Sequence, residues 1–147
     1  MFDKLLQLRE EKELTQKELG KIFKVDRSVI AKWESGLTTI PLKQLNNYSN
    51  YFNVSLDYLT GLSNKKEKSN KNITLDKKII GQNIKTIRQD NNLTLRALAK
   101  ELNTTSSTIS AYETGKTLIL TAFAYQIAKK YKVSIDWLLG KSSNKYL

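Results

Sequence analysis

The feature that most constrains this chain is an internal repeat. When the sequence is shifted by 79 residues, positions 9–63 align with positions 88–142 without a gap. Two unrelated amphipathic helical segments would not keep register over this length, so the chain consists of two copies of one domain. Identical residues recur along the whole alignment, among them Arg9/Arg88, Leu19/Leu98, Ile30/Ile109, Glu34/Glu113, Gly36/Gly115, Val54/Val133, Asp57/Asp136 and Gly61/Gly140.

A polar segment separates the two copies. From Ser63 to Asn72 the chain reads SNKKEKSNKN, which contains four Lys, one Glu and no apolar residue. Such a segment cannot bury a core, so we expect a flexible basic linker. The expected boundaries are 1–63 for the first domain, 64–73 for the linker, 74–142 for the second domain and 143–147 for a tail.

Apolar periodicity and capping residues predict five helices in the first copy. They cover residues 2–12, 16–23, 27–34, 41–52 and 55–60, with Asp26 and Ser55 as N-caps and Pro41 at a first helical position. The second copy follows the same pattern and opens with a helix that reaches about residue 90. Neither copy has the alternating β-branched runs or hairpin turns of strands. We therefore predict an all-α chain of two tandem five-helix domains.

Composition narrows the classes of function. The 147 residues carry a net charge of +11 and include neither His nor Cys. The charge favours a polyanionic partner, and the missing residue types remove the usual zinc ligands, general bases and nucleophiles. We expect no enzyme, no metal and no cofactor. No apolar run has the ~18–20 residues of a membrane span, and the charged N-terminus is unlike a signal peptide. We expect a cytoplasmic, nucleoid-associated protein without membrane binding.

The repeated segments resemble a known family. LTQKELGKIFKVDRSVIAKWESG (residues 14–36), followed by VSLDYLTG, looks like the helix-turn-helix domain of the phage repressor and Cro class, the XRE family. LTLRALAKELNTTSSTISAYETG, followed by VSIDWLLG, is similar to the same domain. The resemblance implies two lambda-repressor-like domains in tandem, each of which reads DNA with the second helix of its motif.

The small residues and the turn of each motif have structural roles. Gly20 and Ala99 leave room for the two motif helices to cross closely, and Ile30 and Ile109 fill the matching space. The turn between the helices favours a residue that tolerates positive φ. In the second copy Asn103 suits this position. In the first copy Lys24 does not, so we expect either strain at Lys24 or a different turn.

The resemblance also implies an ion pair within each copy. Arg9 would pair with Glu34, and Arg88 with Glu113, because both members recur at the same offset. Each pair would tie the first helix to the end of the third. The alternative for each glutamate is a solvated charge at a helix end.

In this family the second motif helix enters the major groove, and residues near its N-terminus contact base edges. Carried over, the family pattern implies phosphate contacts from amide groups near the end of this helix, with Gln16 either at a phosphate or supporting the helix. The implied DNA-binding residues of the first copy are Gln16, Arg27, Ser28, Ala31, Lys32, Ser35, Gly36 and Thr38. Those of the second copy are Thr105, Ser106, Ser107, Ser110, Ala111, Thr114, Gly115, Lys116 and Thr117.

The charge is divided unevenly between the copies. Residues 1–63 carry nine Lys/Arg against eight Asp/Glu, whereas residues 79–147 carry ten against four. The cationic recognition helix therefore belongs to the nearly neutral domain, and the neutral recognition helix belongs to the basic one. We expect one copy to read sequence and the other mainly to supply attraction to phosphate.

Four positions near the fourth helix change from polar residues or proline to apolar residues in the second copy. They indicate either a surface for a protein partner or ordinary repacking of a small core. The four residues are Leu118, Leu120, Phe123 and Tyr125.

Two functional hypotheses follow. The leading one is a sequence-specific regulator of transcription that binds double-stranded DNA, with repression as the favoured outcome. The alternative is a protein-interaction module of antitoxin or inhibitor type, in which one copy has been repurposed for partner binding or dimerisation. On DNA, either one chain places both heads through its linker, or two chains form a homodimer.

Overall fold

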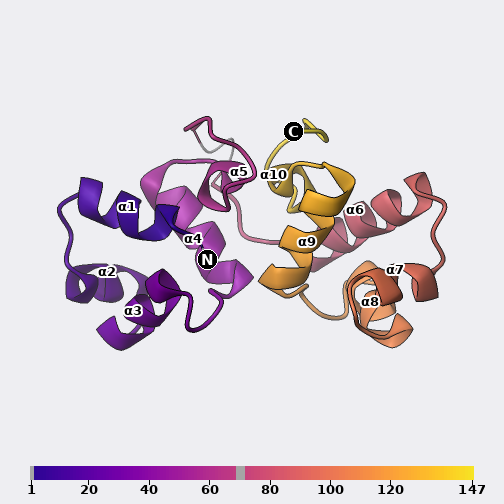
Figure 1. The fold of residues 1–147 in the computed structure, drawn as a ribbon, viewed down its shortest axis with the longest axis horizontal. Coiled ribbons are helices and arrows are strands. Elements are labelled where there is room, and N and C mark those ends of the chain that lie inside the picture. The colour runs from indigo at the N-terminus through magenta and orange to yellow at the C-terminus, as the bar shows by residue number, and fades with distance from the viewer. Residues whose placement is uncertain (1, 69–71) are drawn as a thin grey trace. The chain divides into compact units, whose positions relative to one another are not determined.

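The computed structural model describes residues 2–68 and 72–147. It divides the chain into two compact units, Met1–Asn70 and Lys71–Leu147. The described residues of each unit contain five helices (Figure 1). Apart from one isolated antiparallel bridge between Val133 and Tyr146, the regular secondary structure of these residues is helical. The prediction of an all-α chain with two tandem five-helix domains is confirmed.

Two helices of the first unit begin at other residues than predicted. Helix α1 begins at Lys4 rather than at residue 2, and Asp3, which precedes it, forms no side-chain cap. Helix α4 begins after Pro41, whose ψ of 147° is extended rather than helical. The five helices are α1 (Lys4–Glu11), α2 (Gln16–Phe23), α3 (Arg27–Ser35), α4 (Leu42–Phe52) and α5 (Leu56–Leu59).

The second unit repeats this order with one longer helix. Its first helix has 14 residues, whereas α1 has 8. Gly81 on the additional turn lets this helix approach the end of the third one, because a Cβ at Gly81 would collide with the carbonyl oxygens of Tyr112 and Glu113. The helices are α6 (Lys77–Asp90), α7 (Leu95–Glu101), α8 (Ser106–Glu113), α9 (Thr121–Tyr131) and α10 (Ile135–Leu138).

Side-chain caps determine where the motif helices begin. At the start of α2 the hydroxyl of Thr15 accepts from the amide of Glu18 at 3.1 Å, and the Glu18 carboxylate accepts from the Thr15 amide at 3.0 Å. At the start of α3 the Asp26 carboxylate accepts from the amide of Ser28 at 2.9 Å. That hydrogen bond holds the pKa of Asp26 below its usual value. These caps satisfy amides that have no partner within the helix.

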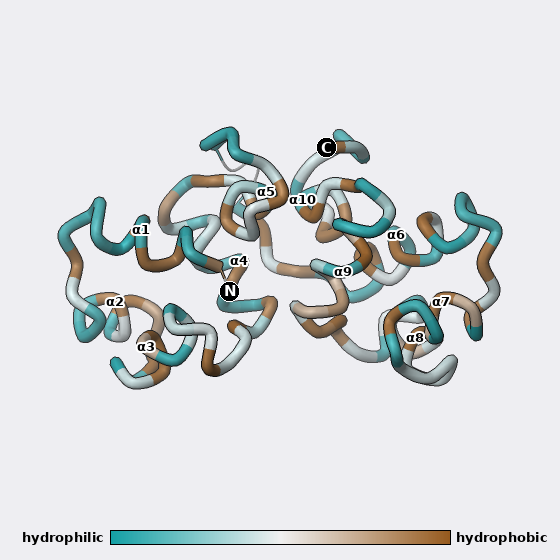
Figure 2. The backbone as a smooth tube through the Cα atoms, viewed as in Figure 1, coloured by the Kyte–Doolittle hydropathy of each residue, from teal (hydrophilic) through white to brown (hydrophobic). Residues whose placement is uncertain are grey.

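Each helix contributes an apolar side chain to a buried core. Figure 2 shows hydrophobic positions recurring along the helices, whereas residues 64–68 are hydrophilic. Burying one Leu or Ile side chain contributes about 1.5–3 kcal/mol. In the first unit the fully buried set includes Leu5, Leu19, Ile30, Leu45 and Leu59. Their equivalents in the second unit are buried as well: Ile84, Leu98, Ile109, Ala124 and Leu138.

Non-glycine residues with positive φ occur at the same three positions in both units. Lys24 has φ 58° and its equivalent Asn103 has φ 57°. The turn between the motif helices is therefore the same in both units, and the alternative of a different turn at Lys24 is wrong. A side chain in this region costs roughly 1–2 kcal/mol, and Asn bears the conformation better than Lys. Each of the three pairs joins one Asn to one long charged residue: Glu13/Asn92, Lys24/Asn103 and Asn53/Lys132.

The segment after the fifth helix returns to its own unit. In the first unit the amide of Ser55 donates to the carbonyl oxygen of Glu67 at 2.9 Å, and Lys66 Nζ pairs with Glu11 Oε2 at 2.6 Å. Residues 66 and 67, which we expected to belong to the linker, therefore contact the first domain. Residues 69–71, also in the expected linker, lie outside the described part of the chain. The second unit has the matching contacts, Ser134 with Lys145 and Lys145 with Asp90.

A helix that crosses a membrane must be both long and apolar. None of the helices in residues 2–68 and 72–147 meets both conditions.

Lys141 is fully buried in the second unit, at the position that Leu62 occupies in the first. Burial lowers the pKa of Lys141 to about 8, and the charge of Asp136 opposes this shift. Between that value and the ordinary lysine value of 10.5, the folded protein binds fewer protons than the unfolded chain. The cost of burying the charge is fully present below pH 8 and is relieved as the pH rises through this window.

Replacing Lys24 with Asn is expected to raise the free energy of unfolding by about 0.5–1 kcal/mol, because Asn tolerates the left-handed turn. The reverse change, Asn103→Lys, should lower it by a similar amount. Denaturant titrations of both variants beside the parent protein measure the two effects. A Lys24→Asn variant less stable than the parent would contradict this account of the turn.

The burial of Lys141 predicts that stability rises by roughly 1–3 kcal/mol between pH 8 and pH 10.5. A Lys141→Leu variant should lack this increment, because Leu has no charge to bury. Chemical denaturation of both proteins across this range measures the difference. If the two proteins show the same pH dependence, Lys141 does not cause it.

Candidate nucleic-acid interface

An arginine–glutamate fork joins three segments of the first unit. Arg9 Nε and Nη2 donate to Glu34 Oε2 and Oε1 at 2.6 and 3.0 Å. Arg9 Nη1 donates to the carbonyl oxygen of Leu14 at 2.8 Å. The two side chains are only 12% and 4% exposed, and the hydrogen bond to Glu34 raises the pKa of Arg9. One guanidinium from α1 therefore holds both the chain before α2 and the last turn of α3.

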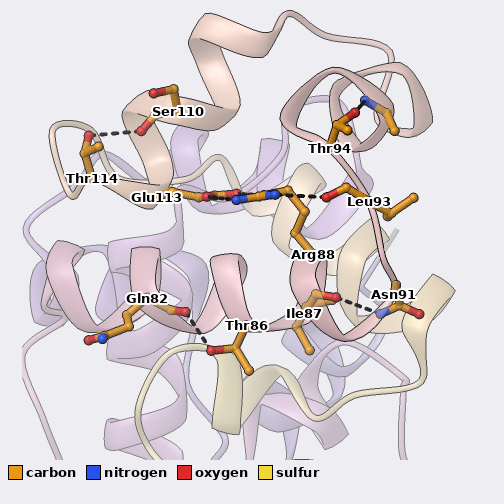
Figure 3. Close-up of polar contacts among 11 residues, drawn as sticks. Gln82, Thr86, Ile87, Arg88, Asn91, Leu93, Thr94, Ser110, Glu113 and Thr114 are labelled. Atoms are coloured by element: carbon orange, nitrogen blue, oxygen red, sulfur yellow. Dashed lines mark hydrogen bonds and ion pairs between the residues drawn. The ribbon is translucent and has the colours of Figure 1, made fainter.

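The second unit contains the same fork (Figure 3). Arg88 Nε and Nη2 donate to Glu113 Oε2 and Oε1 at 2.7 and 3.0 Å, and Nη1 donates to the carbonyl oxygen of Leu93 at 2.9 Å. Figure 3 shows the Arg88 side chain lying between Glu113 and Leu93. The structure thus brings the residues of both expected pairs together with matching geometry.

Gln16 extends the fork in the first unit alone. Its Nε2 donates to Glu34 Oε1 at 3.0 Å, so the first residue of α2 also contacts the end of α3. Leu95 occupies the equivalent position of the second unit. Of the two roles expected for Gln16, the structure shows the contact that supports the recognition helix.

Helix α3 has a buried back and an exposed front. Ile30 and Trp33 are buried against the core. The fork holds the last turn, and Asp26 caps the first. The front of α3 is therefore a fixed polar and cationic surface. Its side chains are exposed or, in the case of the alanine, half-buried: Arg27, Ser28, Lys32 and Ala31.

Helix α8 has the same arrangement with a neutral front. Ile109 and Tyr112 are buried on its back. The hydroxyl of Thr105 accepts from the amide of Thr108 at 3.2 Å and so serves as the N-cap. Most of the residues expected to contact DNA lie along one groove of about 390 Å³ on the front. Its lining is Leu95, Ser106, Ser107, Ser110, Ala111, Thr114 and Lys116.

In the loops after α3 and α8, several backbone amides that we expected to contact phosphate are already hydrogen-bonded within the protein. The amide of Gly36 donates to the carbonyl oxygen of Trp33, and that of Thr38 to Lys32, both at 3.3 Å. Because these amides are engaged within the protein, they are not open donors for phosphate as the sequence led us to expect. In the second unit three amides are engaged in the same way, those of Gly115, Lys116 and Thr117.

The side chains of these loops fall into two groups. The hydroxyl of Ser35 donates to the carbonyl oxygen of Lys32 at 3.2 Å, and that of Thr114 donates to Ser110 at 3.0 Å. The remaining polar side chains, from Thr38, Lys116 and Thr117, are exposed. These exposed side chains are therefore the groups that remain open for phosphate among those expected in the loops.

Three of the four apolar residues considered as a partner surface are half-buried. The ring of Phe123 lies 6.3 Å from that of Tyr112, and Lys129 Nζ lies 5.8 Å from the ring of Tyr125. Leu118 is also half-buried, whereas Leu120 is 60% exposed. Of the four side chains, Leu120 is thus the one that presents mostly open apolar surface.

Sequence reasoning overlooked two cations on the helix before each recognition helix. Lys17 and Lys21 are exposed on α2, and their equivalents Arg96 and Lys100 are exposed on α7. The 79-residue offset pairs a cation with a cation at both positions. That pairing was a signal in the sequence for a shared electrostatic role.

Replacing Arg88 with Ala is expected to lower the free energy of unfolding by about 1–3 kcal/mol, because Glu113 and the Leu93 carbonyl lose their partner. Arg88→Lys should recover only part of the loss, since one ammonium cannot reproduce the planar fork. Thermal unfolding measures both variants, with Arg96→Ala as an exposed-arginine control. Unchanged stability of Arg88→Ala would show that the fork does not hold the motif.

Two family models match the chain, one in each unit. Residues 5–59 match a model described as helix-turn-helix, and residues 81–142 match one described as helix-turn-helix domain. The HTH-type transcriptional activator BcrR of Enterococcus faecalis is 42% identical over 57 residues, which cover 39% of this chain and 28% of BcrR. The chain thus spans little more than a quarter of that relative.

Among solved structures, the clp gene regulator ClgR from C. glutamicum aligns with a TM-score of 0.41 and 20% identity. The alignment covers 47% of this chain and 90% of ClgR. The two family matches fall on the two units, and each unit contains the forked motif described above. The two models together cover most of the chain, which therefore belongs to the helix-turn-helix family and carries two domains of that family in tandem.

Proposed function

We propose that this chain is a sequence-specific regulator of transcription that binds double-stranded DNA by placing α3 and α8 in the major groove. The observation that carries the proposal is the fork, which in each unit holds a helix with a buried back and a polar, exposed front. The major groove admits a helix of this kind, and the net charge of +11 attracts the polyanion.

The two heads read DNA by different chemistry. In the first, the guanidinium of Arg27 forms a bidentate pair with guanine, and the methyl group of Ala31 contacts thymine. In the second, the hydroxyls of Ser106, Ser107 and Ser110 accept or donate hydrogen bonds with several bases. The first head therefore discriminates more strongly between sequences. The second adds affinity, which the linkage of two heads in one chain increases further.

We propose repression as the outcome of binding. A protein bound at a promoter excludes polymerase without any further contact, whereas activation requires a favourable contact with the transcription machinery. BcrR is named as an activator, so an experiment must decide whether this chain represses or activates transcription. Transcription in vitro from a template carrying the bound sequence should fall as this protein is added, and a rise would show activation instead.

One observation favours the second candidate, a protein-interaction module of antitoxin or inhibitor type. The large apolar side chains that are exposed in the first unit all correspond to charged residues in the second. The pairs are Leu6/Lys85, Ile22/Glu101, Leu37/Lys116 and Tyr51/Lys130. Three of the four charged residues are lysines, as expected if the first unit contacts a protein while the second contacts DNA, whereas the fourth, Glu101, pairs with Lys130. Binding to duplex DNA that is weak and independent of salt would favour this candidate.

The proposal predicts that Arg27→Ala weakens binding to a duplex selected in vitro by the full chain. The loss should be roughly 5- to 150-fold, because one bidentate base contact contributes about 1–3 kcal/mol of discrimination. Binding to an unrelated duplex should change much less, since Arg27 contributes mainly to recognition of sequence. Titrations of both duplexes by parent and variant measure the ratio. Equal binding of the selected duplex by both proteins would contradict the role of α3.

A further inference from the structure

A groove of about 650 Å³ lies on the first unit, between the end of α2 and the side of α4. Apolar side chains, two lysines and three side-chain amides of α4 line it. Among the residues that the structure describes, no carboxylate and no residue of α3 belongs to the lining. The groove is therefore cationic, partly apolar and separate from the front of the recognition helix.

The apolar part of the groove is held in place by the protein itself. The ring of Tyr51 stands edge-on to the ring of Phe23, with centroids 5.8 Å apart, and to that of Phe52, with centroids 5.0 Å apart. Tyr51 is nevertheless 45% exposed, and the neighbouring Ile22 is 39% exposed. A fixed and exposed aromatic ring is a favoured contact surface for another protein, because little side-chain freedom is lost on binding.

The two lysines of the groove are open to a partner. Lys24 and Lys43 are exposed, and neither belongs to an ion pair within residues 2–68 and 72–147. Lys24 stands at a φ of 58°, a conformation that Asn bears better. The first unit thus carries a cation here at some cost in stability. The groove complements a partner with carboxylates beside an apolar side chain.

The second unit has an ion pair at the same place. Ile22 and Tyr51 correspond to Glu101 and Lys130, and these two charged residues pair with each other. Both units keep the fork and the motif helices, so the shared fold does not require the groove. It is a feature of the first unit. The residues that replace the two groove lysines are uncharged: Asn103 and Ala122.

We propose that this groove is the docking site for an acidic peptide segment of another protein. An apolar side chain of the segment would pack against Tyr51 and Ile22, and neighbouring carboxylates would pair with Lys24 and Lys43. Charge complementarity and the exposed apolar wall together favour this occupant over the DNA backbone, which offers charge but no apolar side chain. The inference goes beyond the proposed DNA binding and does not depend on it.

The probe is a library of random peptides displayed on phage and selected against the full chain. Enriched peptides are synthesised, and their affinity for the chain is measured by fluorescence anisotropy. They should carry Asp or Glu within a few positions of Trp, Phe or Leu. The proposal fails if no peptide is enriched, or if the enriched peptides lack carboxylates.

A double variant transfers the ion pair of the second unit into the groove. Ile22→Glu with Tyr51→Lys keeps the net charge and should weaken peptide binding by at least about tenfold, because the apolar wall is lost. The control is Leu6→Gln with Leu37→Gln, which removes two exposed apolar side chains outside the groove and should bind as the parent does. Circular dichroism checks the helix content of both. Parent-like affinity of the groove variant would contradict the proposal.

Lys24→Asn separates loss of charge from loss of folding, because it should make the protein more stable. It should nevertheless weaken peptide binding about two- to fivefold and make that binding less sensitive to salt. Lys43→Gln should have a similar effect on affinity. If neither variant changes affinity or its salt dependence, the lysines do not bind carboxylates and the assignment is wrong.

Two further measurements detect other occupants. If the parent chain self-associates in sedimentation and the variant with Ile22→Glu and Tyr51→Lys does not, the groove binds a second copy rather than an acidic peptide. If duplex DNA displaces the peptides from the parent, the groove belongs to the DNA interface. Either result overturns the proposal. Because the peptide assay itself contains no DNA, its outcome is separate from that of the proposed DNA binding.

Discussion

The geometry of each head depends on one guanidinium. Arg9 or Arg88 binds both oxygens of a glutamate at the end of the recognition helix and the carbonyl oxygen before the preceding helix. Apolar contacts bury the back of α3 and α8, but they act over an area and have no preferred direction. A bidentate charge-assisted pair supplies that direction. The fork thus makes the exposed front of the helix a fixed surface, on which any reading of bases depends.

The two units keep this frame and differ in what they present to solvent. Five equivalent apolar positions, one per helix, are buried in both, and the left-handed turn between the motif helices is the same. The recognition helix is cationic in the first unit and hydroxyl-rich in the second. Exposed apolar residues of the first unit, such as Tyr51, correspond to charged residues of the second. Duplication with divergence of this kind gives one chain two motif helices with chemically different exposed faces.

Features governed by local sequence were predictable, and those governed by loop conformation or distant contacts were not. Apolar periodicity and the N-caps gave the helices to within one or two residues at most ends, because both signals lie within the helix itself. The positive φ at Lys24 was one of two expected outcomes. The engaged amide of Gly36 depends on the path of the loop, and the contact of Lys66 with Glu11 joins the polar segment to the end of α1, 55 positions earlier in the chain. Lys141 is buried although its residue type predicts exposure.

The central claim is that this chain contains two DNA-reading heads, and a hydroxyl-radical footprint on a duplex selected by the full chain tests it most directly. The account predicts two protected segments. One should be lost when Arg27 and Lys32 are replaced by Ala, and the other when the front of α8 is altered at Ser106 and Ser107. The account would be contradicted if the parent protein protected a single segment and one of the two variants still protected that segment fully.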